Sequence, residues 1–373
     1  MTRSAAGTGR GGTVPVLVGA VCGLAWAASL RAFMAEFAGS ESTFHWFGTY
    51  EGILLPGAVV GGLLGWSEHL QRSGGRPRRW LAAAPLVFVL ATPGVVVSVF
   101  VDGLGGGALA VPLFGVAGGY ALSGGGPRWA RWVAGAVALL PVPVWLIGTS
   151  FVGGALAPWT PRGAWLAVLF LSLLAVLSLS CTIPRRATAE LLRSRRRLVL
   201  VGGVCGLAWG AGMRAFMAAA AGPESRVSWL GTFAIILLIS AVVGGLLGWA
   251  EHLRRTGDGR RLRRLALAPL LFTIDPASLV ITLPALAGGY ALSGRGSQRA
   301  RWTTGACALL PVPVFLIAVA FLDDIRTLST PRGTWMAVLL FSHLAVLTLA
   351  CALPRRAPEV VTPSEARDTA VGP

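Results

Sequence analysis

The chain carries an internal duplication that extends over most of its length. The run Gly-Leu-Ala-Trp at 23–26 returns at 206–209, and Arg-Ala-Phe-Met-Ala at 31–35 returns at 214–218. The correspondence continues to the ends of both halves, where Cys-Thr-Ile-Pro-Arg-Arg at 181–186 matches Cys-Ala-Leu-Pro-Arg-Arg at 351–356. A repeat this long predicts two similar structural units and limits the folds that are open to the chain.

The composition is typical of an integral membrane protein. Of the 373 residues, 54% are hydrophobic and 13% are charged, and the mean hydropathy is +0.70. Apolar segments of about 20 residues recur, which is the length of helix that crosses a hydrocarbon core of about 30 Å. The basic residues are all arginine, and the chain is rich in alanine, glycine and valine, as in proteins of GC-rich bacterial genomes. We therefore predict an all-α polytopic membrane protein.

The predicted spans and domains follow the duplication, with six spans in each of two parallel repeats and about 12 transmembrane segments in total. The spans are predicted at 14–37, 47–70, 80–101, 105–123, 132–155, 163–183, 198–220, 229–253, 300–322 and 333–353, with an ambiguous stretch at 265–294. The domains are predicted as a disordered tail (1–13), a first repeat (14–186), a basic linker (187–197), a second repeat (198–357) and a disordered tail (358–373).

Arginines gather in alternate connections between these spans. They stand at 72–79, 128–131, 185–197, 254–264, 295–301 and 355–356, whereas the other connections hold only Arg162, Arg226, Arg326 and Arg332. The positive-inside rule then places both termini in the cytoplasm, with the protein in the cytoplasmic (inner) membrane of a bacterium. The net charge of +17 is thus explained by topology and by contact with anionic membrane lipids rather than by nucleic-acid binding.

The segment 265–294 is much shorter than its counterpart 80–124 in the first half. A single span there would put the two following arginine clusters on the wrong side, and two full spans do not fit. A short re-entrant hairpin that turns near Asp275-Pro276 satisfies both constraints. Two short tilted helices in a thinned bilayer are the alternative.

A local motif strengthens the transporter-like organisation. Gly65-Trp66-Ser67-Glu68-His69-Leu70-Gln71-Arg72 follows the second span, and Gly248-Trp249-Ala250-Glu251-His252-Leu253-Arg254-Arg255 repeats it. A glycine, acid and basic signature in this loop, with six plus six spans, resembles the major facilitator superfamily. The resemblance implies a pseudo-twofold axis along the membrane normal and a solute site between the halves.

Arg31 and Arg214 are the first candidate site residues, because they occupy matched positions inside the first span of each half. A guanidinium keeps its proton, so it must be paired or solvated within a span. The pair predicts a clamp for an anion or lipid headgroup. The alternative is a structural role, either snorkelling to the interface or pairing with Glu36 or Glu51, although the second half has alanine at both acidic positions.

Several other polar residues in or near the spans are candidates for gating or coupling. Glu51 is either a proton-coupling carboxylate or a boundary residue in water, and Asp275 is either at a re-entrant tip or in an ordinary turn. The matched pairs Glu68-His69 and Glu251-His252 predict a helix-end gate or ion pairs with the following arginines. They do not predict a metal site, because adjacent helical residues point about 100° apart and no second histidine follows four residues on.

Matched Pro-Val-Pro runs at 141–143 and 311–313 predict kinks in the fifth span of each half. His343 is expected to bond a neighbouring group within its span.

The sequence points to no cofactor, no metal and no catalytic constellation. A nucleotide-binding loop of the GxxxxGK[ST] type is missing, which excludes an ATP-driven pump of that kind within this chain. Three functions remain open. The first is a secondary transporter of a small anionic or amphipathic solute. The second is a non-catalytic membrane subunit that serves a membrane protein partner, and the third is an intramembrane lipid-handling enzyme that uses the acids near the outer leaflet.

Overall fold

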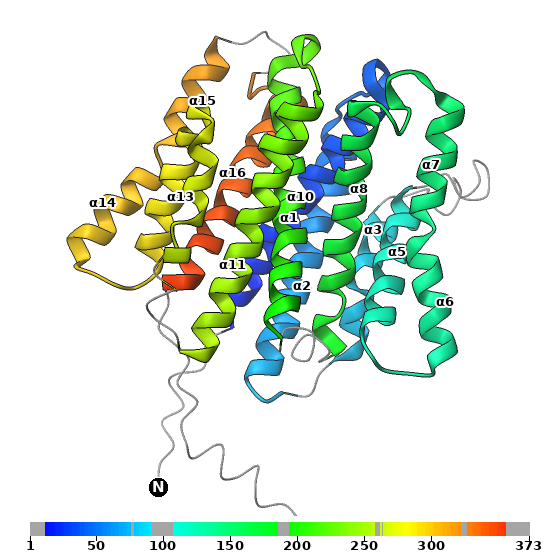
Figure 1. Cartoon of the computed structure of the whole chain (residues 1–373), viewed down its shortest axis with the longest axis horizontal. Helices are drawn as coiled ribbons and strands as arrows, with labels where there is room; N and C mark the ends of the chain where they lie inside the picture. The colour runs from blue at the N-terminus through cyan, green and yellow to red at the C-terminus, as the bar shows by residue number, and fades with distance from the viewer. Residues whose placement is uncertain are drawn as a thin grey trace, which may run out of the picture.

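The computed structural model describes residues 12–75, 78–91, 107–185, 194–257, 262, 264–321 and 327–355. Every regular element within these ranges is helical (Figure 1). The tails predicted at 1–13 and 358–373 lie outside the described residues, apart from positions 12 and 13, where the first helix begins. The predicted linker 187–197 is described only from residue 194, and Ser194 caps a helix that begins at Arg195.

The helices of the first half follow in this order: α1 (Thr13–Ala38), a π-helical segment (Phe47–Leu54) continuous with α2 (Leu55–Arg72), a 3-10 segment (Arg79–Leu86) continuous with α3 (Val87–Ala91), α5 (Gly107–Leu122), α6 (Arg128–Leu139), α7 (Pro141–Val152) and α8 (Pro161–Ser180). Those of the second half are α10 (Arg195–Ala221), a π-helical segment (Trp229–Leu238) continuous with α11 (Ile239–Thr256), a 3-10 segment (Ala268–Ile274), α13 (Leu279–Leu292), α14 (Gln298–Ala308), α15 (Pro311–Ala320) and α16 (Pro331–Ala352). Short 3-10 turns stand at Gly39–Glu41, Gly154–Leu156, Ile183–Arg185, Gly222–Glu224, Pro276–Ser278 and Leu353–Arg355.

The described part of the chain contains 8 helices that are long and apolar enough to cross a membrane. The protein is therefore an integral membrane protein with several spans, as predicted. The prediction of about 12 full-length spans differs from this number, because the elements at Arg79–Ala91, Leu109–Leu122 and Leu279–Leu292 are shorter apolar helices. Pro85 stands in the 3-10 segment that begins the first of these regions, and Pro269 stands in the 3-10 segment Ala268–Ile274 before the last; at both positions an α-helix would lack a backbone donor.

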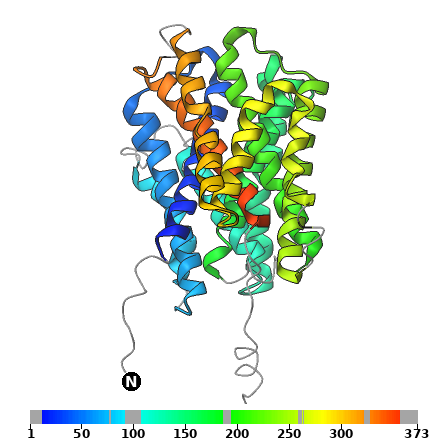
Figure 2. The same ribbon diagram turned by 90° about the vertical axis from the view of Figure 1, so that its left-hand side faces the viewer.

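Four helices, α1, α8, α10 and α16, form the centre of the molecule (Figure 1). Helices α1 and α2 lie on one face and α10 and α11 on the other (Figure 2), while α6–α7 and α14–α15 lie at the two outer edges. The central helices pack across the halves, α1 against α16 and α10 against α8. The first helix of each half is thus held by the last helix of both halves.

Buried tryptophans connect these central helices through hydrogen bonds to backbone carbonyls. Within each half, Trp26 Nε1 donates to the Leu173 carbonyl at 2.8 Å, and Trp209 Nε1 donates to the His343 carbonyl at 2.9 Å. Between the halves, Trp165 Nε1 donates to the Ala211 carbonyl at 3.4 Å and Trp335 Nε1 to the Ala28 carbonyl at 3.2 Å. Each bond satisfies an indole N–H that would be costly to bury alone.

Glycines bring the first two helices of each half into close backbone contact. A Cβ atom built on Gly61 of α2 would lie 2.1 Å from the Gly19 carbonyl oxygen of α1. At the matched position in the second half, a Cβ on Gly244 would lie 2.2 Å from the Gly202 carbonyl oxygen. Small residues are the usual means by which membrane helices approach this closely.

The Pro-Val-Pro runs, where kinks are predicted, coincide with the boundaries between two helices in each half. Helix α6 ends at Leu139 and α7 begins at Pro141, while α14 ends at Ala308 and α15 begins at Pro311. Proline is tolerated at the first turn of a helix, so each run stands at the start of the second helix of its pair.

The ambiguous stretch 265–294 forms a short hairpin. The 3-10 segment Ala268–Ile274 packs against α13, and the chain turns at Asp275–Ser278, close to the predicted position. Asp275 Oδ1 accepts a hydrogen bond from the Ala277 N–H at 3.2 Å, and the Ser278 hydroxyl donates to the Asp275 carbonyl at 2.7 Å. Asp275 therefore makes the turn bonds that an Asp-Pro pair is known for.

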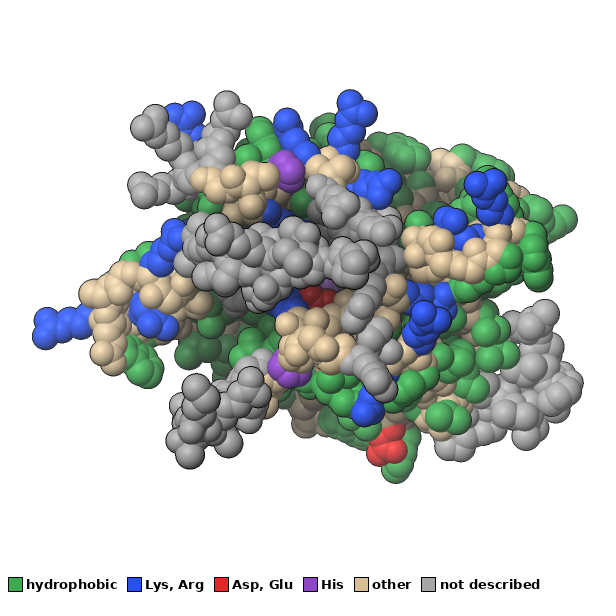
Figure 3. Space-filling view, turned by 90° about the horizontal axis from the view of Figure 1, so that it is seen from below, with side chains coloured by type: hydrophobic (Ala, Val, Ile, Leu, Met, Phe, Trp, Pro, Cys, Tyr) green, Lys and Arg blue, Asp and Glu red, His purple; other side chains and the backbone are tan. Residues whose placement is uncertain are grey.

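The two ends of the molecule differ in charge. The end seen from below in Figure 3 carries many arginine side chains and few acidic ones, and hydrophobic side chains surround it. The loops that join α5 to α6 and α13 to α14 lie at this end (Figure 1). We refer to it as the arginine-rich end, and to the opposite end, which contains the loops after α1 and α10, as the loop end.

Candidate functional site

Arg31 of α1 forms hydrogen bonds with the loop that follows α1 and with the π-helical segment after it. Its side chain is 5% exposed. Its Nη2 donates to the Thr43 carbonyl at 2.7 Å, its Nη1 donates to the Ser42 hydroxyl at 3.4 Å, and its Nε donates to the Thr49 hydroxyl at 3.4 Å. The guanidinium also lies 3.8 Å from the ring centre of Phe44.

Arg214 makes the same set of bonds in the second half. Its Nη2 donates to the Arg226 carbonyl at 2.8 Å, its Nη1 to the Ser225 hydroxyl at 3.2 Å and its Nε to the Thr232 hydroxyl at 3.4 Å. Thr49 and Thr232 both belong to the π-helical segments that precede α2 and α11. The two arginines thus have matched structural partners, which are neutral oxygens of their own loops.

Glu36 pairs with Arg162 at the start of α8 rather than with Arg31. Arg162 Nη2 donates to Glu36 Oε2 at 3.0 Å and to the Glu36 carbonyl at 2.9 Å. The pair is half-buried, with the Glu36 side chain 20% exposed and that of Arg162 39% exposed. Glu51 is exposed in the π-helical segment and does not take part in the Glu36–Arg162 ion pair.

A cavity of about 520 Å³ opens between α1 and α10 at the loop end. We call it the loop-end cavity. Its lining consists mainly of pairs of matched residues from the two halves. These pairs are Ala32 and Ala215, Ala35 and Ala218, Glu36 and Ala219, Gly39 and Gly222, Ser42 and Ser225, Phe44 and Val227, and Arg162 and Arg332, with Ser40 and Trp335 in addition.

The charge around the loop-end cavity is predominantly positive. Among the described residues, Arg162, Arg332 and Glu36 line it, and Arg31 and Arg214 stand behind Ser42 and Ser225 in its wall. Within this group, Arg162 Nη2 and Glu36 Oε2 form an ion pair of 3.0 Å. The described residues thus place four guanidinium groups and one carboxylate in or behind the lining of this cavity.

Two buried tryptophans, of which Trp335 also lines the loop-end cavity, connect the halves in the core. Trp165 and Trp335 are almost fully buried there and bond to the opposite half. Deeper in the core, Ser29 Oγ lies 3.1 Å from His343 Nε2, and His343 Nδ1 lies 2.8 Å from the Leu339 carbonyl. The expectation that His343 bonds a neighbour is confirmed, and one of its bonds joins the two halves.

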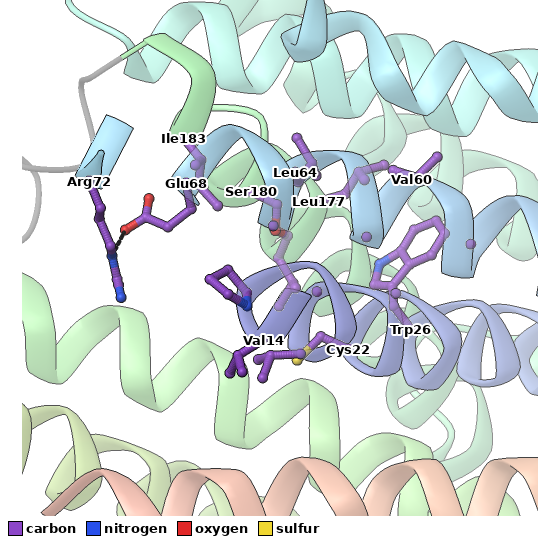
Figure 4. A pocket seen from close by; sticks show the side chains of 18 of the residues that line it. Val14, Cys22, Trp26, Val60, Leu64, Glu68, Arg72, Leu177, Ser180 and Ile183 are labelled. Carbon is purple, nitrogen blue, oxygen red and sulfur yellow. Dashed lines mark hydrogen bonds and ion pairs between the residues drawn. The ribbon is translucent and has the colours of Figure 1, made fainter. Parts of the chain in front are cut away.

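A second cavity of about 420 Å³ opens toward the arginine-rich end inside the first half (Figure 4). Its walls are mostly apolar residues of α1, α2 and α8, and Trp26 lies at its deep end. Glu68 and Arg72 lie at its mouth and form an ion pair of 2.9 Å. A half-exposed pair of this kind contributes little to stability, so its position is of more interest than its strength.

Of the remaining predicted residues, His69, Glu251 and His252 lie at the arginine-rich end, whereas Asp275 lies at the turn of the hairpin. His69 lies beside Gly12 at the start of α1, because a Cβ built on Gly12 would lie 3.0 Å from His69 Nε2. Glu251 accepts hydrogen bonds from Arg254 and Arg255 at 2.7 and 2.8 Å. His252 is half-buried on the same helix, and Asp275 is occupied by the hairpin turn. No group of three or more His, Cys, Asp or Glu among the residues described is arranged to hold a metal ion.

The sequence analysis did not single out Arg162 and Arg332 as site residues, although they line the loop-end cavity. The signal was present, because the run Thr-Pro-Arg-Gly at 160–163 returns at 330–333. In both copies the threonine caps the helix by accepting a hydrogen bond from the glycine N–H at 3.1 Å. The arginine that follows the proline is then held in the first turn of α8 or α16.

Comparisons with known proteins give no relative for this chain, since no family model, no curated protein and no solved structure matches it.

Proposed function

We propose that this protein is a secondary transporter of a small anionic or amphipathic solute, with its solute site in the loop-end cavity. The observation that carries the proposal is the lining of this cavity. Matched residues from the two halves surround a single space, and among the described residues of its lining two arginines accompany one acid. A site at the interface of two repeated bundles is the usual arrangement in transporters built by duplication.

The proposal includes two parallel repeats of six membrane segments each. The repeated sequence supports it, and so do the matched hydrogen bonds of Arg31 and Arg214 and of the two tryptophan pairs. An even number of crossings in each half would relate the repeats by an axis along the membrane normal. The likeness to the major facilitator superfamily is part of this proposal and concerns organisation only.

The arrangement of the cavities is compatible with alternating access. The loop-end cavity and the cavity beside Glu68 open at opposite ends, and the layer of Trp165, Trp335 and the Ser29–His343 contact lies between α1 and the opposite half. Rocking of the halves about this layer would open and close the loop-end cavity, which lies between them. In this scheme the pairs Glu68-His69 and Glu251-His252 act as gates at the arginine-rich end.

The proposed orientation has the arginine-rich end and both termini in the cytoplasm, in agreement with the positive-inside rule. The loop-end cavity would then face the outside, and anionic lipids of the inner leaflet would contact the arginines of the other end.

Ligand-dependent thermal stability of the purified protein tests the proposed site. A panel of carboxylates, phosphates and sulfonates is compared on the parent chain and on the double variant R162Q/R332Q. A true ligand stabilises the parent by about 1 kcal/mol or more when its concentration is several times Kd, and this effect disappears in the variant. R226Q is the control, because Arg226 is exposed at the same end and contributes only its backbone carbonyl to Arg214.

Uptake into proteoliposomes tests transport itself. A ligand from the panel should enter vesicles that contain the parent protein and should not enter those that contain R162Q/R332Q. Binding without uptake would exclude transport and leave a receptor or subunit role.

A non-catalytic membrane subunit is the second candidate. It is favoured by the bonding of Arg31 and Arg214, whose hydrogen bonds to their own loops serve a structural purpose without any solute. A panel without a single stabilising anion would support this function over transport.

A further inference from the structure

Helix α6, at an outer edge of the molecule, begins at the arginine-rich end with two arginines on one face (Figure 1). Arg128 and Arg131 are three residues apart, and residues with this spacing are neighbours on a helix surface. A cavity of about 510 Å³ opens beside them, and its lining consists of Ala121, Arg128, Arg131, Trp132 and Gly135. We call it the edge cavity. It shares no lining residue with the two cavities described above.

The guanidinium of Arg131 is anchored on one side only. Its Nε donates to the Ala121 carbonyl of α5 at 3.3 Å, and the side chain is half-buried. In the part of the chain that the structure describes, no residue accepts a hydrogen bond from the Nη atoms of Arg131 or from Arg128, and no acid pairs with either. Like charges at this spacing repel each other, so an anion between the two arginines is favourable.

The turn between α5 and α6 holds the arginines in place without a ligand. Gly126 has a φ of +84°, a conformation that favours glycine, and a Cβ atom built there would lie 2.2 Å from the Tyr120 hydroxyl. The Ser123 hydroxyl donates to the Tyr120 carbonyl at 2.7 Å. A site whose donors are already positioned loses little conformational entropy when it binds.

The surroundings of the edge cavity are those of a surface that faces lipid. Trp129 and Trp132 are 70% and 79% exposed, and Val133 and Leu139 of the same helix are exposed as well. The span that begins with this helix, Arg128–Phe151, is buried over only 17% of its apolar stretch, whereas six other candidate spans are buried over 33% or more. Tryptophan prefers the level of the lipid headgroups, because its ring is apolar and its N–H is polar. The edge cavity therefore lies at the level of lipid phosphates.

We propose that the edge cavity binds one anionic phospholipid of the leaflet at the arginine-rich end. Arg128 and the Nη donors of Arg131 bind the phosphate, and the acyl chains lie along the exposed apolar residues of α6. The two unesterified oxygens of a phosphodiester match the forked donors of guanidinium groups. Basic pockets at this level of a membrane protein are suited to anionic headgroups. The site does not depend on the proposed transport, so either proposal can fail alone.

The second half provides a matched position with one arginine fewer on this face. The run Ala-Arg-Trp at 130–132 returns at 300–302, and the arginine of each copy bonds a carbonyl of the preceding helix, at 3.3 and 3.2 Å. Gln298 stands where the first half has Arg128, and Arg299 points about 100° away from it. We therefore expect the second copy to bind the same lipid more weakly.

Native mass spectrometry of the purified full-length protein tests the site by counting bound lipids. The protein is stripped of lipid in detergent and titrated with dioleoylphosphatidylglycerol, with dioleoylphosphatidylcholine as the counterpart without net charge. The parent should bind phosphatidylglycerol more tightly, and R128Q/R131Q should weaken this binding by about tenfold or more, because charged hydrogen bonds are lost. R79Q/R196Q is the control, since it removes the same charge from exposed positions that do not line the edge cavity.

Two further variants test the shape of the cavity and the pairing of the arginines. G135L keeps both arginines and fills the edge cavity, and it should also weaken binding of phosphatidylglycerol by about tenfold. The helix tolerates this change, because a Cβ built on Gly135 meets only the Ala121 Cβ at 3.8 Å and leucine is a better helix former than glycine. Q298R completes the arginine pair of the second half, so a second phosphatidylglycerol should bind about tenfold more tightly than it binds the parent.

Several outcomes would overturn the proposal. Equal affinity of the parent for the two lipids removes the role of charge, and an equal loss in R79Q/R196Q shows general attraction instead of a site. Glycerol phosphate distinguishes a lipid from a soluble ester: if it binds as tightly as phosphatidylglycerol does, the assignment to a lipid is wrong. Full affinity in G135L, or an unchanged second affinity in folded Q298R, contradicts the assignment to paired arginines in this cavity.

Discussion

Buried arginines in this protein organise the loops that surround the cavity. Arg31 and Arg214 each donate to a loop carbonyl, a serine hydroxyl and a threonine hydroxyl, and these loops supply Ser42 and Ser225 to the cavity lining. A guanidinium can serve three acceptors at once because its donors form a rigid planar fork. The geometry of the cavity lining thus depends on Arg31 and Arg214, which do not line the cavity but bond to residues that do.

Replacement of either arginine should therefore loosen its loop. R31Q and R214Q each remove charged hydrogen bonds from a buried place, and we expect each to lower the free energy of unfolding by roughly 1.5–3 kcal/mol. R31K and R214K should rescue little, because an ammonium lacks the fork. Thermal unfolding in detergent and limited proteolysis at 42–46 or 225–228 measure the effect, and R226Q should behave as the parent. Variants as stable as the parent would show that the loops hold without these bonds.

The contact between Ser29 and His343 depends on a glycine at the matched position in the other half. Gly212 corresponds to Ser29, and a Cβ built on it would lie 2.5 Å from His343 Nε2 and 2.6 Å from Ser29 Oγ. G212A should cost about 1–3 kcal/mol, because the well-packed core must move to admit the methyl group. G203A on the same helix is the control, since its Cβ would meet nothing closer than 3.6 Å. The midpoint of thermal unfolding compares the two, and equal midpoints would contradict the described packing.

At the level of elements, the helix pairs α1–α2 and α10–α11 have their backbones in close contact. Their glycines allow backbone atoms of neighbouring helices to touch, which is favourable in lipid because dispersion between helices replaces the hydrophobic effect. The π-helical segments at the start of α2 and α11 widen the first turns and present Thr49 and Thr232 to the buried arginines.

Two adjacent glycines of α2 offer a matched test of this packing. G61A directs its new methyl group at the Gly19 carbonyl, 2.1 Å away, whereas G62A meets only side-chain and backbone atoms at 3.7 Å or more. We expect G61A to destabilise the protein by about 1–3 kcal/mol or more and G62A to be close to neutral. Yield of folded protein and its thermal midpoint provide the measurement. A destabilisation of similar size in both variants would point to helix propensity or lipid contact instead of close packing.

At the level of the whole molecule, charge and cavities define two chemically different ends. Among the described residues, most arginines lie at the arginine-rich end, and the loop end carries the cavity lined by both halves (Figures 1 and 3). The proposed direction of access to the site depends on which end faces the cytoplasm.

Cysteine labelling in intact cells decides this orientation. E41C places a thiol at the loop end and S73C places one at the arginine-rich end, both at exposed positions. In a chain whose five native cysteines are replaced by alanine, a membrane-impermeant maleimide should label E41C directly and S73C only after permeabilisation. The opposite pattern would reverse the proposed orientation and turn the loop-end cavity toward the cytoplasm.

The sequence by itself determined the membrane character, the positions of the long helices and the breaks at the proline pairs. These features depend on local properties, namely the length of apolar runs and the missing N–H of proline. The recurring run Arg-Ala-Phe-Met-Ala also identified Arg31 and Arg214 as a pair, because a charge inside a span is recognisable without a structure.

Only the tertiary structure decided what those arginines touch and which residues meet at the cavity. Glu36 is close to Arg31 in the sequence, but the chain brings Arg162 to it from a distant helix. Arg162 and Arg332 lie in the first turns of α8 and α16, outside the apolar core of their spans. Charged residues are common at such positions, so the sequence did not mark these two as site residues. Their meeting with Ala219 and Glu36 follows from the packing of α8 and α16 against α10 and α1, and such long-range packing depends on side-chain shape that no local pattern records.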